Sequence, residues 1–265
     1  MHSLITRHSA FTLLGLFAVS AAGQSAIYTF DNLNVGQSLV SQDGWVSAGG
    51  VSNPTVQLWD NSPASAGSLE SWASRRFDSG FPGRAELASQ EFTAKFDTVF
   101  IPNAPNGGSA LSLFRDFDEN GQLNSSAEPW ISFGLDKIGS VPRLRLNSSG
   151  LDQNSEMLVG DIVSAGDQLT LELVSGSEGE QIVLSLYLEN RSQAPETRHL
   201  IVSQVQTDLT GEVVEGLSTM SIRQGGGFID NIEIAIASEP CPADVAPPMG
   251  VLDLFDVNEF VTGFI

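Results

Sequence analysis

Two stretches of the chain alternate strictly between apolar and polar side chains. Residues 168–174 place Leu169, Leu171 and Leu173 on one side and polar residues on the other. Residues 181–190 repeat the pattern, with Ile or Leu at every second position. Because successive side chains of a β-strand point to opposite faces, this period of two predicts strands with one face in a core and the other in water.

Shorter runs of the same kind fill the middle of the chain. Further strands are expected at 55–59, 71–77, 92–101, 110–117, 130–135, 144–146, 200–205, 220–222 and 228–236. Turn-forming residues separate them, for example Pro-Asn-Gly-Gly at 105–108 and Gly-Ser-Glu-Gly at 176–179. No stretch keeps a 3.6-residue period over three turns. The sequence therefore predicts an all-β domain over 27–237, folded as a two-sheet antiparallel jelly-roll sandwich.

The N-terminal residues 1–23 carry the signals of export. A basic start that ends at Arg7 precedes an apolar run over 10–22, and small residues follow. The run is too short to span a bilayer, so the pattern indicates a secretory signal peptide with cleavage between Ala22 and Ala26. No later stretch resembles a membrane span. The mature protein is therefore expected to be secreted, either free or attached to a cell surface.

Acidic side chains outnumber basic ones by 32 to 12, which gives the 265-residue chain a formal net charge of -20. Such a surface repels phosphate backbones, and this excludes nucleic acids as partners. The only lysines are Lys95 and Lys137, so there is no polybasic membrane patch. Divalent cations are the partners that this charge favours. The single cysteine, Cys241, excludes an internal disulfide framework.

Residues 116–124 form the sharpest local motif of the predicted domain. Oxygen-bearing side chains alternate there, and a glycine at 121 allows a sharp turn, as in the opening of an EF-hand calcium loop. Asp116, Asp118, Asn120 and the Gln122 carbonyl are the candidate calcium ligands. The pattern then departs, because position 127 is alanine where a bidentate glutamate is usual. A plain turn rich in Asp and Asn is the alternative interpretation.

The two ends of the predicted domain resemble those of secreted jelly-roll modules. The segment 28–33, Tyr-Thr-Phe-Asp-Asn-Leu, resembles the opening strand of the concanavalin A-like lectin and laminin-G group. The segment 227–234, Gly-Phe-Ile-Asp-Asn-Ile-Glu-Ile, resembles the closing strand of the same group. The resemblance implies that the first and last strands lie side by side. It also implies a structural calcium held by Asp31 and Asp230, for which ordinary turn residues are the alternative.

The composition changes after residue 237. A proline-rich hinge at 238–243 precedes a segment whose later apolar residues follow the stripe of a short amphipathic helix. Carboxylates at the entrance of such a helix suit both calcium and the positive end of the helix dipole. Asp253, Asp256 and the Val251 carbonyl are therefore candidate calcium ligands. A disordered acidic tail is the alternative.

This C-terminal segment, 244–265, resembles a single dockerin repeat of the variant that begins with Cys-Pro-Ala-Asp. The resemblance rests on three short motifs: Cys-Pro-Ala-Asp at 241–244, Gly-Val-Leu-Asp at 250–253 and Phe-Asp-Val at 255–257. It implies a further ligand at Asp244 and docking to a cohesin-like partner. Two features depart from the family. Dockerins normally have two repeats, and Asp244 is one residue out of register.

No motif typical of a catalytic site stands out, neither glycosidase-type paired carboxylates nor a phosphate-binding glycine loop. Trp59 and Trp72 lie beside polar residues, which suits sugar recognition, although core packing is the commoner role of a strand tryptophan. The expected function is a calcium-dependent, non-catalytic recognition module with polysaccharide as the candidate ligand. The alternatives are a polysaccharide hydrolase tethered by its dockerin and a surface structural protein without a glycan ligand.

Overall fold

A computed structural model of the chain describes residues 24–49, 52–57, 63–64, 71–77, 91–104, 108–149, 155–195, 197–225 and 227–236. These residues belong to one compact unit, Gly23–Ala237. The expected signal peptide, hinge and dockerin-like repeat lie outside the described residues.

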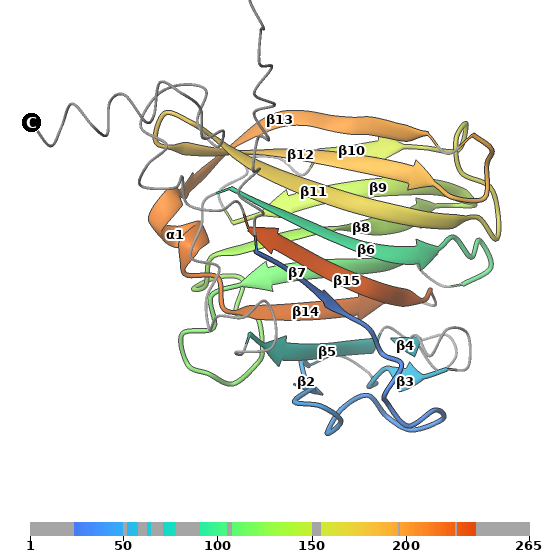
Figure 1. The fold of residues 1–265 in the computed structure, drawn as a ribbon, viewed down its shortest axis with the longest axis horizontal. Helices are drawn as coiled ribbons and strands as arrows, with labels where there is room; N and C mark the ends of the chain where they lie inside the picture. The colour runs from blue at the N-terminus through green and yellow to red at the C-terminus, as the bar shows by residue number, and fades with distance from the viewer. Residues whose placement is uncertain are drawn as a thin grey trace, which may run out of the picture. The chain divides into compact units, whose positions relative to one another are not determined.

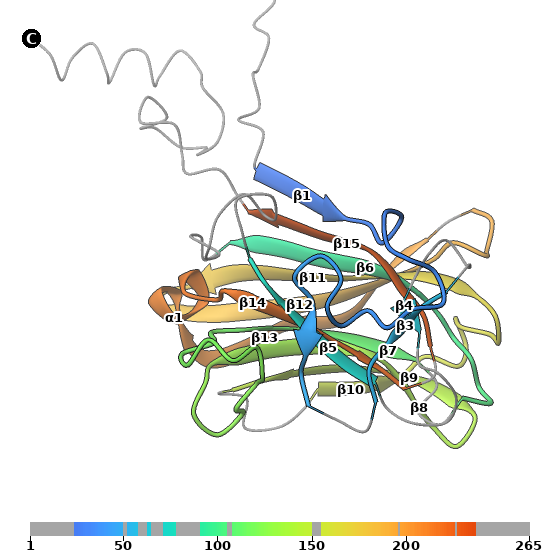
Figure 2. The same ribbon diagram turned by 90° about the horizontal axis from the view of Figure 1, so that it is seen from below.

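Two antiparallel sheets stack face to face (Figure 1 and Figure 2). The six-stranded sheet faces the reader in Figure 1 and comprises, in spatial order, β1 (Gln24–Tyr28), β15 (Ile229–Ile236), β6 (Phe92–Val99), β11 (Gln168–Glu178), β12 (Gln181–Asn190) and β13 (Arg198–Thr210). The seven-stranded sheet comprises β10 (Ser155–Leu158), β9 (Val141–Ser148), β8 (Trp130–Ile138), β7 (Ser109–Phe114), β14 (Thr219–Gln224), β5 (Ser71–Arg76) and β2 (Val46–Ser47). A short pair, β3 (Thr55–Val56) with β4 (Pro63–Ala64), and the one-turn helix α1 (Gly211–Glu215) complete the described elements.

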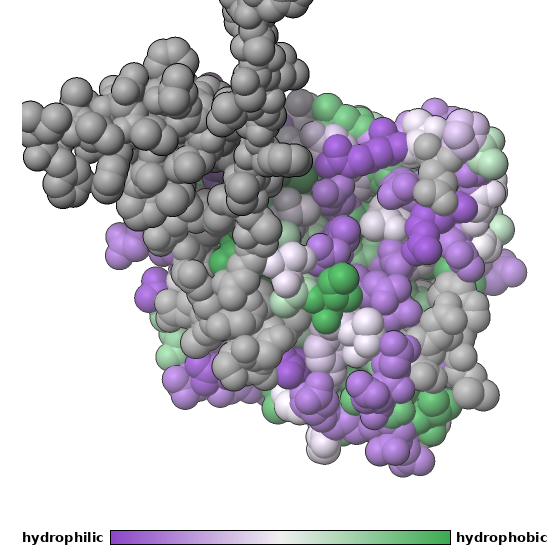
Figure 3. Space-filling model, viewed as in Figure 1, coloured by the Kyte–Doolittle hydropathy of each residue, from purple (hydrophilic) through white to green (hydrophobic). Residues whose placement is uncertain are grey.

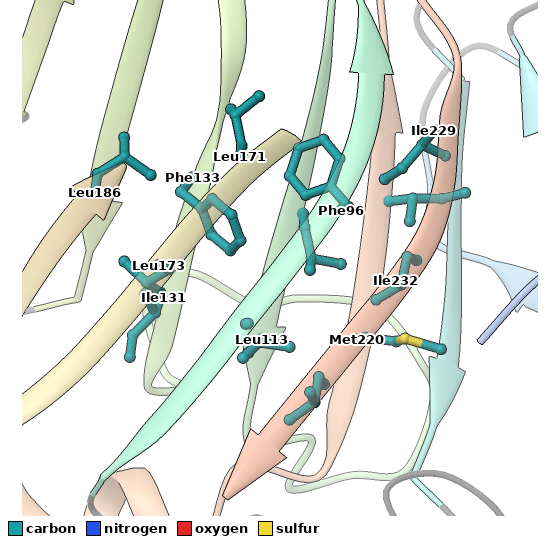
Figure 4. Packing of buried hydrophobic residues seen from close by; sticks show 14 of the residues in the cluster. Phe96, Leu113, Ile131, Phe133, Leu171, Leu173, Leu186, Met220, Ile229 and Ile232 are labelled. Carbon is teal, nitrogen blue, oxygen red and sulfur yellow. The ribbon is translucent and has the colours of Figure 1, made fainter. Parts of the chain in front are cut away.

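The hydrophobic core lies between the two sheets. Every second residue of β11 and β12 is buried over most of each strand, as the alternation in the sequence predicts. Phe96 from the six-stranded sheet and Phe133 from the seven-stranded sheet meet there, with ring centroids 5.4 Å apart (Figure 4). Burying a side chain of this size contributes about 1.5–3 kcal/mol, so such contacts hold the two layers together.

The first and last described strands are neighbours. In the β1–β15 pair, Tyr28 lies opposite Ile232 and Gln24 opposite Ile236. On its other side β15 pairs with β6, so this strand is hydrogen-bonded along both edges. The adjacency implied by the jelly-roll resemblance is therefore confirmed, although the first strand ends at Tyr28, where the segment 28–33 that carries the resemblance begins.

The all-β sandwich expected from the sequence is confirmed, and most of its strands lie where the alternation places them. The unexpected strands β2, β4 and β10 have only two to four residues, too few for a period of two to show. The outer surface of the six-stranded sheet is largely hydrophilic where the described residues are visible (Figure 3). Among the described residues, no helix has the length and apolarity that a membrane crossing requires.

Candidate functional site

The outer face of the seven-stranded sheet carries two rows of side chains that run across the strands. The first row consists of Ser74, Ser221, Ser112, Ser132 and Asn147. The second row consists of Trp72, Arg223, Ala110, Gly134, Arg145 and Glu156. These residues point outward because their neighbours along the strands, such as Leu111 and Phe133, are buried in the core. The face is therefore polar, with small side chains at its centre and large ones at both ends of the second row.

A pocket, which we call the outer pocket, opens at the centre of this face. It is lined by Gly108, Ser109, Ala110, Ser132, Phe133, Gly134, Leu135, Asp136, Arg145, Asn147, Arg223 and Gly225. The floor of the pocket is formed by the smallest side chains of this face, because Ala110 of β7 lies opposite Gly134 of β8. A Cβ atom at Gly134 would lie only 2.4 Å from that of Ala110. The hollow thus follows from a close approach of two strands that only glycine permits.

Four charged side chains form one network beside the outer pocket. Both carboxylate oxygens of Asp136 accept hydrogen bonds from Arg143, and one also accepts from Arg145 at 3.1 Å. Glu156 accepts a 2.7 Å bond from Arg143, and its other oxygen lies 3.2 Å from Arg145 Nε. The hydrogen bonds that Arg143 donates to Asp136 raise the pKa of Arg143 above its already high ordinary value. The network joins β8, β9 and β10 and fixes both arginine side chains.

Several buried polar atoms on this face lack a hydrogen-bond partner among the described residues. They include Trp130 Nε1, Arg145 Nε and Asn147 Oδ1 on β8 and β9, and Ser74 Oγ and Thr219 Oγ1 on β5 and β14. Leaving a buried donor or acceptor unpaired costs about 1–3 kcal/mol, so such groups in a folded protein call for an explanation. Arg145 and Asn147 both line the outer pocket. A hydroxyl group of a ligand in that pocket can accept from Arg145 Nε or donate to Asn147 Oδ1, so it is chemically suited to pair with either atom.

Trp72 lies half-buried on β5 in the same row as the pocket residues. The guanidinium carbon of its cross-strand neighbour Arg223 is 5.5 Å from the centre of a Trp72 ring, within the range of a cation–π contact. Arg223 also lines the outer pocket, so it connects the tryptophan to the hollow. The second predicted sugar-binding tryptophan, Trp59, lies outside the described residues.

Residues 115–129, which we call the acidic loop, connect β7 to β8 and bring three carboxylates together. Oxygens of Asp116, Asp118 and Glu128 lie within 4.8 Å of one another. Asp116 is only 5% exposed and Glu128 only 4%. Of the ion pairs that the described residues form, none includes any of these three carboxylates. Clustered carboxylates without a cationic side chain fit a hard divalent cation, which prefers oxygen ligands.

Backbone N–H groups of the acidic loop hold its buried carboxylates in place. Asp116 accepts hydrogen bonds from the N–H groups of Asn120 at 3.2 Å and Gly121 at 2.9 Å. Glu128 accepts from Phe117 at 3.1 Å and from Asn124 at 2.7 Å. Gly121 has a φ of +73°, the left-handed conformation that glycine adopts without strain. The positive ends of these N–H dipoles keep the carboxylates ordered and close together.

Two of the four ligands predicted in this loop, Asp116 and Asp118, are thus brought together. The other two belong to the same turn, where the Asn120 side-chain oxygen accepts a 2.6 Å bond from the Gln122 N–H. Sequence reasoning missed Glu128, because the EF-hand pattern puts the last ligand at position 127. A turn in which the N–H of Glu128 donates to the Asn124 carbonyl at 2.9 Å brings this carboxylate back to the cluster. The available signal was a glutamate one residue beyond the expected position.

The calcium site implied for Asp31 and Asp230 stays a prediction. Asp31 is exposed, whereas Asp230 is buried and accepts a 2.8 Å bond from the Asn231 N–H. Asp230 lies opposite Asp97 of β6. Neither Asp31 nor Asp230 belongs to a group of three or more close metal-ligating side chains within the described ranges.

The calcium ligands predicted in the tail also stay predictions. Asp244, Val251, Asp253 and Asp256 lie outside the described residues, as does Cys241.

The sequence matches no protein-family model, and a search of curated proteins finds no match. Solved structures are similar in fold. The basic winged bean lectin with Tn-antigen has a TM-score of 0.51 at 8% identity, covering 80% of this chain and 98% of the lectin. The acidic winged bean lectin complexed with methyl-α-D-galactose has a TM-score of 0.51 at 7% identity over 80% and 98% of the two chains. Lectin II from Ulex europaeus has a TM-score of 0.50 at 11% identity over 81% and 99%. At these identities the likeness establishes the lectin-like jelly-roll fold and nothing further.

Proposed function

We propose that the domain is a non-catalytic carbohydrate-binding module whose ligand occupies the outer pocket. The observation that carries the proposal is that Arg223, Arg145 and Asn147 line a hollow with a floor of small residues, while Trp72 lies beside it in contact with Arg223. A flat indole ring covers the apolar face of a sugar, while the polar groups pair with its hydroxyls. The fold likeness supports this choice, because winged bean lectins of similar fold bind Tn-antigen and methyl-α-D-galactose.

The charged network supports binding rather than hydrolysis. A glycosidase needs one carboxyl group that donates a proton and a second that acts as base or nucleophile. The carboxylates beside the outer pocket, Asp136 and Glu156, are instead each paired with both Arg143 and Arg145. Such pairing occupies the carboxylate oxygens that catalysis would use.

Calcium in the acidic loop is the second part of the proposal. Asp116, Asp118 and Glu128 would hold the ion, with Asn120 and the Gln122 carbonyl as further oxygen donors. Its chemical contribution would be charge neutralisation and ordering of the loop. The loop lies against the edge of the seven-stranded sheet, where Glu119 forms a 3.0 Å ion pair with Arg76 of β5. An ordered loop would therefore help to fix the position of β5, the strand that carries Trp72.

Export and anchoring complete the proposed function. The signal-peptide pattern at 1–23 supports secretion, and the dockerin resemblance at 244–265 supports attachment to a cohesin-like partner. Under this proposal the sandwich recognises a glycan, and the tail holds the protein at a cell surface or in a larger assembly.

A glycan array followed by isothermal calorimetry on the secreted protein tests the binding function. We expect binding to at least one glycan without release of reducing sugar. Trp72→Ala should weaken binding about tenfold or more, because an aromatic stacking contact contributes about 1–3 kcal/mol. Tyr187→Phe, a change on the other sheet, serves as the control. Release of reducing sugar from a bound glycan would instead favour a hydrolase, and no binding across the array would contradict the proposal.

A further inference from the structure

The outer pocket is too small for a whole sugar ring. Its volume is about 40 Å³. A single water molecule needs roughly 10–15 Å³, so the pocket holds about three heavy atoms. A pyranose ring with its hydroxyl groups is several times larger. A saccharide bound here therefore keeps its ring at the mouth of the pocket and inserts one substituent.

The side wall of the pocket offers an unpaired hydrogen-bond acceptor. Asn147 on β9 lines the pocket, and its buried Oδ1 has no hydrogen-bond partner among the described residues. A buried acceptor in this state lowers stability unless another molecule donates to it. Water can do so in the free protein, whereas a ligand that displaces this water has to bring a donor of its own.

Two hydrogen-bond donors flank this acceptor. Ser132 lies opposite Asn147 on β8, and its hydroxyl accepts a 2.8 Å bond from Ser112, which leaves its own proton for a group in the pocket. Arg145 lies two residues before Asn147 on the same face of β9. Its Nε has no hydrogen-bond partner within the described part of the chain, although a Glu156 oxygen is 3.2 Å away. The pocket therefore presents an acceptor and a donor side by side.

The floor of the pocket is apolar. It consists of the methyl group of Ala110 and the bare backbone of Gly134, which lie opposite each other. A hydroxyl substituent can pair with Asn147, but it leaves this floor to water. A methyl group that covers the floor should raise the affinity about fourfold, because apolar surface is then removed from water.

An acetamido group combines the features that these walls require. Its N–H can donate to Asn147 Oδ1 while its carbonyl oxygen accepts from Ser132 or Arg145. Its methyl group then rests on Ala110 and Gly134. The carbonyl carbon, the oxygen and the methyl group together match the capacity of the pocket. We infer that the outer pocket selects saccharides that carry an acetamido substituent, with Asn147 as the specificity-determining residue. This inference rests on the proposed function.

Sugars that differ only in this substituent test the inference. The probes are the methyl glycosides of glucose, galactose and mannose, each with a hydroxyl, an acetamido or an O-acetyl group at carbon 2. Calorimetry on the secreted protein measures their affinities. In at least one of these sugar series the acetamido form should bind at least about tenfold more tightly than the hydroxyl form. The O-acetyl form lacks the N–H, so its affinity should fall between the two.

Variants of the pocket locate the preference. Asn147→Ala removes the acceptor and should reduce the ratio of acetamido to hydroxyl affinity to about threefold or less. Because the ratio is compared within one variant, a general weakening of binding does not affect the test. Ala110→Val fills the floor and should also reduce the ratio, which provides a second test if the first variant is unstable. Gln181→Ala removes an exposed amide from β12 on the other sheet and, as the matched control, should keep the native ratio.

Equal or lower affinity for the acetamido form in every sugar series that binds would overturn the inference and leave carbohydrate binding in place. If none of these sugars binds, a glycan-array ligand without an acetamido group would overturn it as well. A native ratio in the folded Asn147 variant would contradict the role of that residue. No affinity for any saccharide would count against the proposed function itself.

Discussion

The indole nitrogen of Trp45 donates a 2.9 Å hydrogen bond to the hydroxyl of Tyr28, and both side chains are buried. The Tyr28 hydroxyl in turn donates to Asp43 at 2.7 Å. Arg75 of β5 joins the same cluster, with its Nε donating to the Asp43 carbonyl at 2.9 Å and its guanidinium carbon 5.0 Å from the Tyr28 ring centre. Tyr28 therefore links β1 of one sheet to β5, the strand next to the edge of the other sheet.

Replacing Tyr28 by phenylalanine should lower the free energy of unfolding by about 1–3 kcal/mol, because the buried Trp45 donor loses its acceptor. Urea unfolding followed by fluorescence measures the change. The chain has only two tyrosines, and Tyr187→Phe is the natural control, expected to change stability by no more than about 0.5 kcal/mol. Equal stability of the Tyr28 variant and the native chain would show that the cluster is not a structural link.

The same residue predicts a loss of stability at alkaline pH. Burial, followed by the hydrogen bond to Asp43, raises the pKa of Tyr28 well above its ordinary value of 10.0. The folded state therefore keeps a proton that the unfolded state releases, so the stabilisation is complete below about pH 10 and declines as the pH rises further. Unfolding free energies at pH 9 and pH 11 should differ less in Tyr28→Phe than in the native chain. An identical pH dependence in both proteins would contradict the assignment.

Calcium should raise the thermal stability of the domain through the acidic loop. At a free concentration of about 100 times the dissociation constant, binding to the folded state adds about 2.7 kcal/mol to the free energy of unfolding. Asp118→Asn retains an oxygen but removes one negative charge, and it should abolish most of this calcium-dependent increase in stability. Asp208→Asn, an exposed change on β13, should preserve it. Identical melting curves of the native chain with calcium and with chelator would remove the site.

Gly134→Ala should destabilise the protein by about 1–3 kcal/mol, because the added methyl group would lie 2.4 Å from Ala110 Cβ and would force the strands apart. The same methyl group would enter the outer pocket and weaken saccharide binding. Gly176→Ala is the matched strand control, since its Cβ would meet Val183 at an ordinary 3.5 Å. Chemical denaturation measures the change in stability, and calorimetry measures the change in binding. Equal stability of the Gly134 and Gly176 variants would contradict the predicted steric clash between β7 and β8.

The sandwich was predictable because local alternation, as at Leu169, Leu171 and Leu173, directly reports one buried face. The acidic loop was predictable for a similar reason, since Asp116 and Asp118 are close in sequence. The outer pocket was not, because only the order of β9, β8, β7 and β14 brings Arg145 and Arg223 to the same pocket. Strand order depends on contacts distant in sequence, which periodicity does not encode.

The position of β15 between two partners has a mechanical consequence. The chain leaves the described domain at the end of this strand, and Ile236 is paired there with both Gln24 of β1 and Phe92 of β6. A force applied through the C-terminus along the strand axis would load both hydrogen-bond ladders in shear. Many hydrogen bonds would then have to break at the same time. A protein held by its tail should therefore resist a pulling force that would separate an edge strand one hydrogen bond at a time.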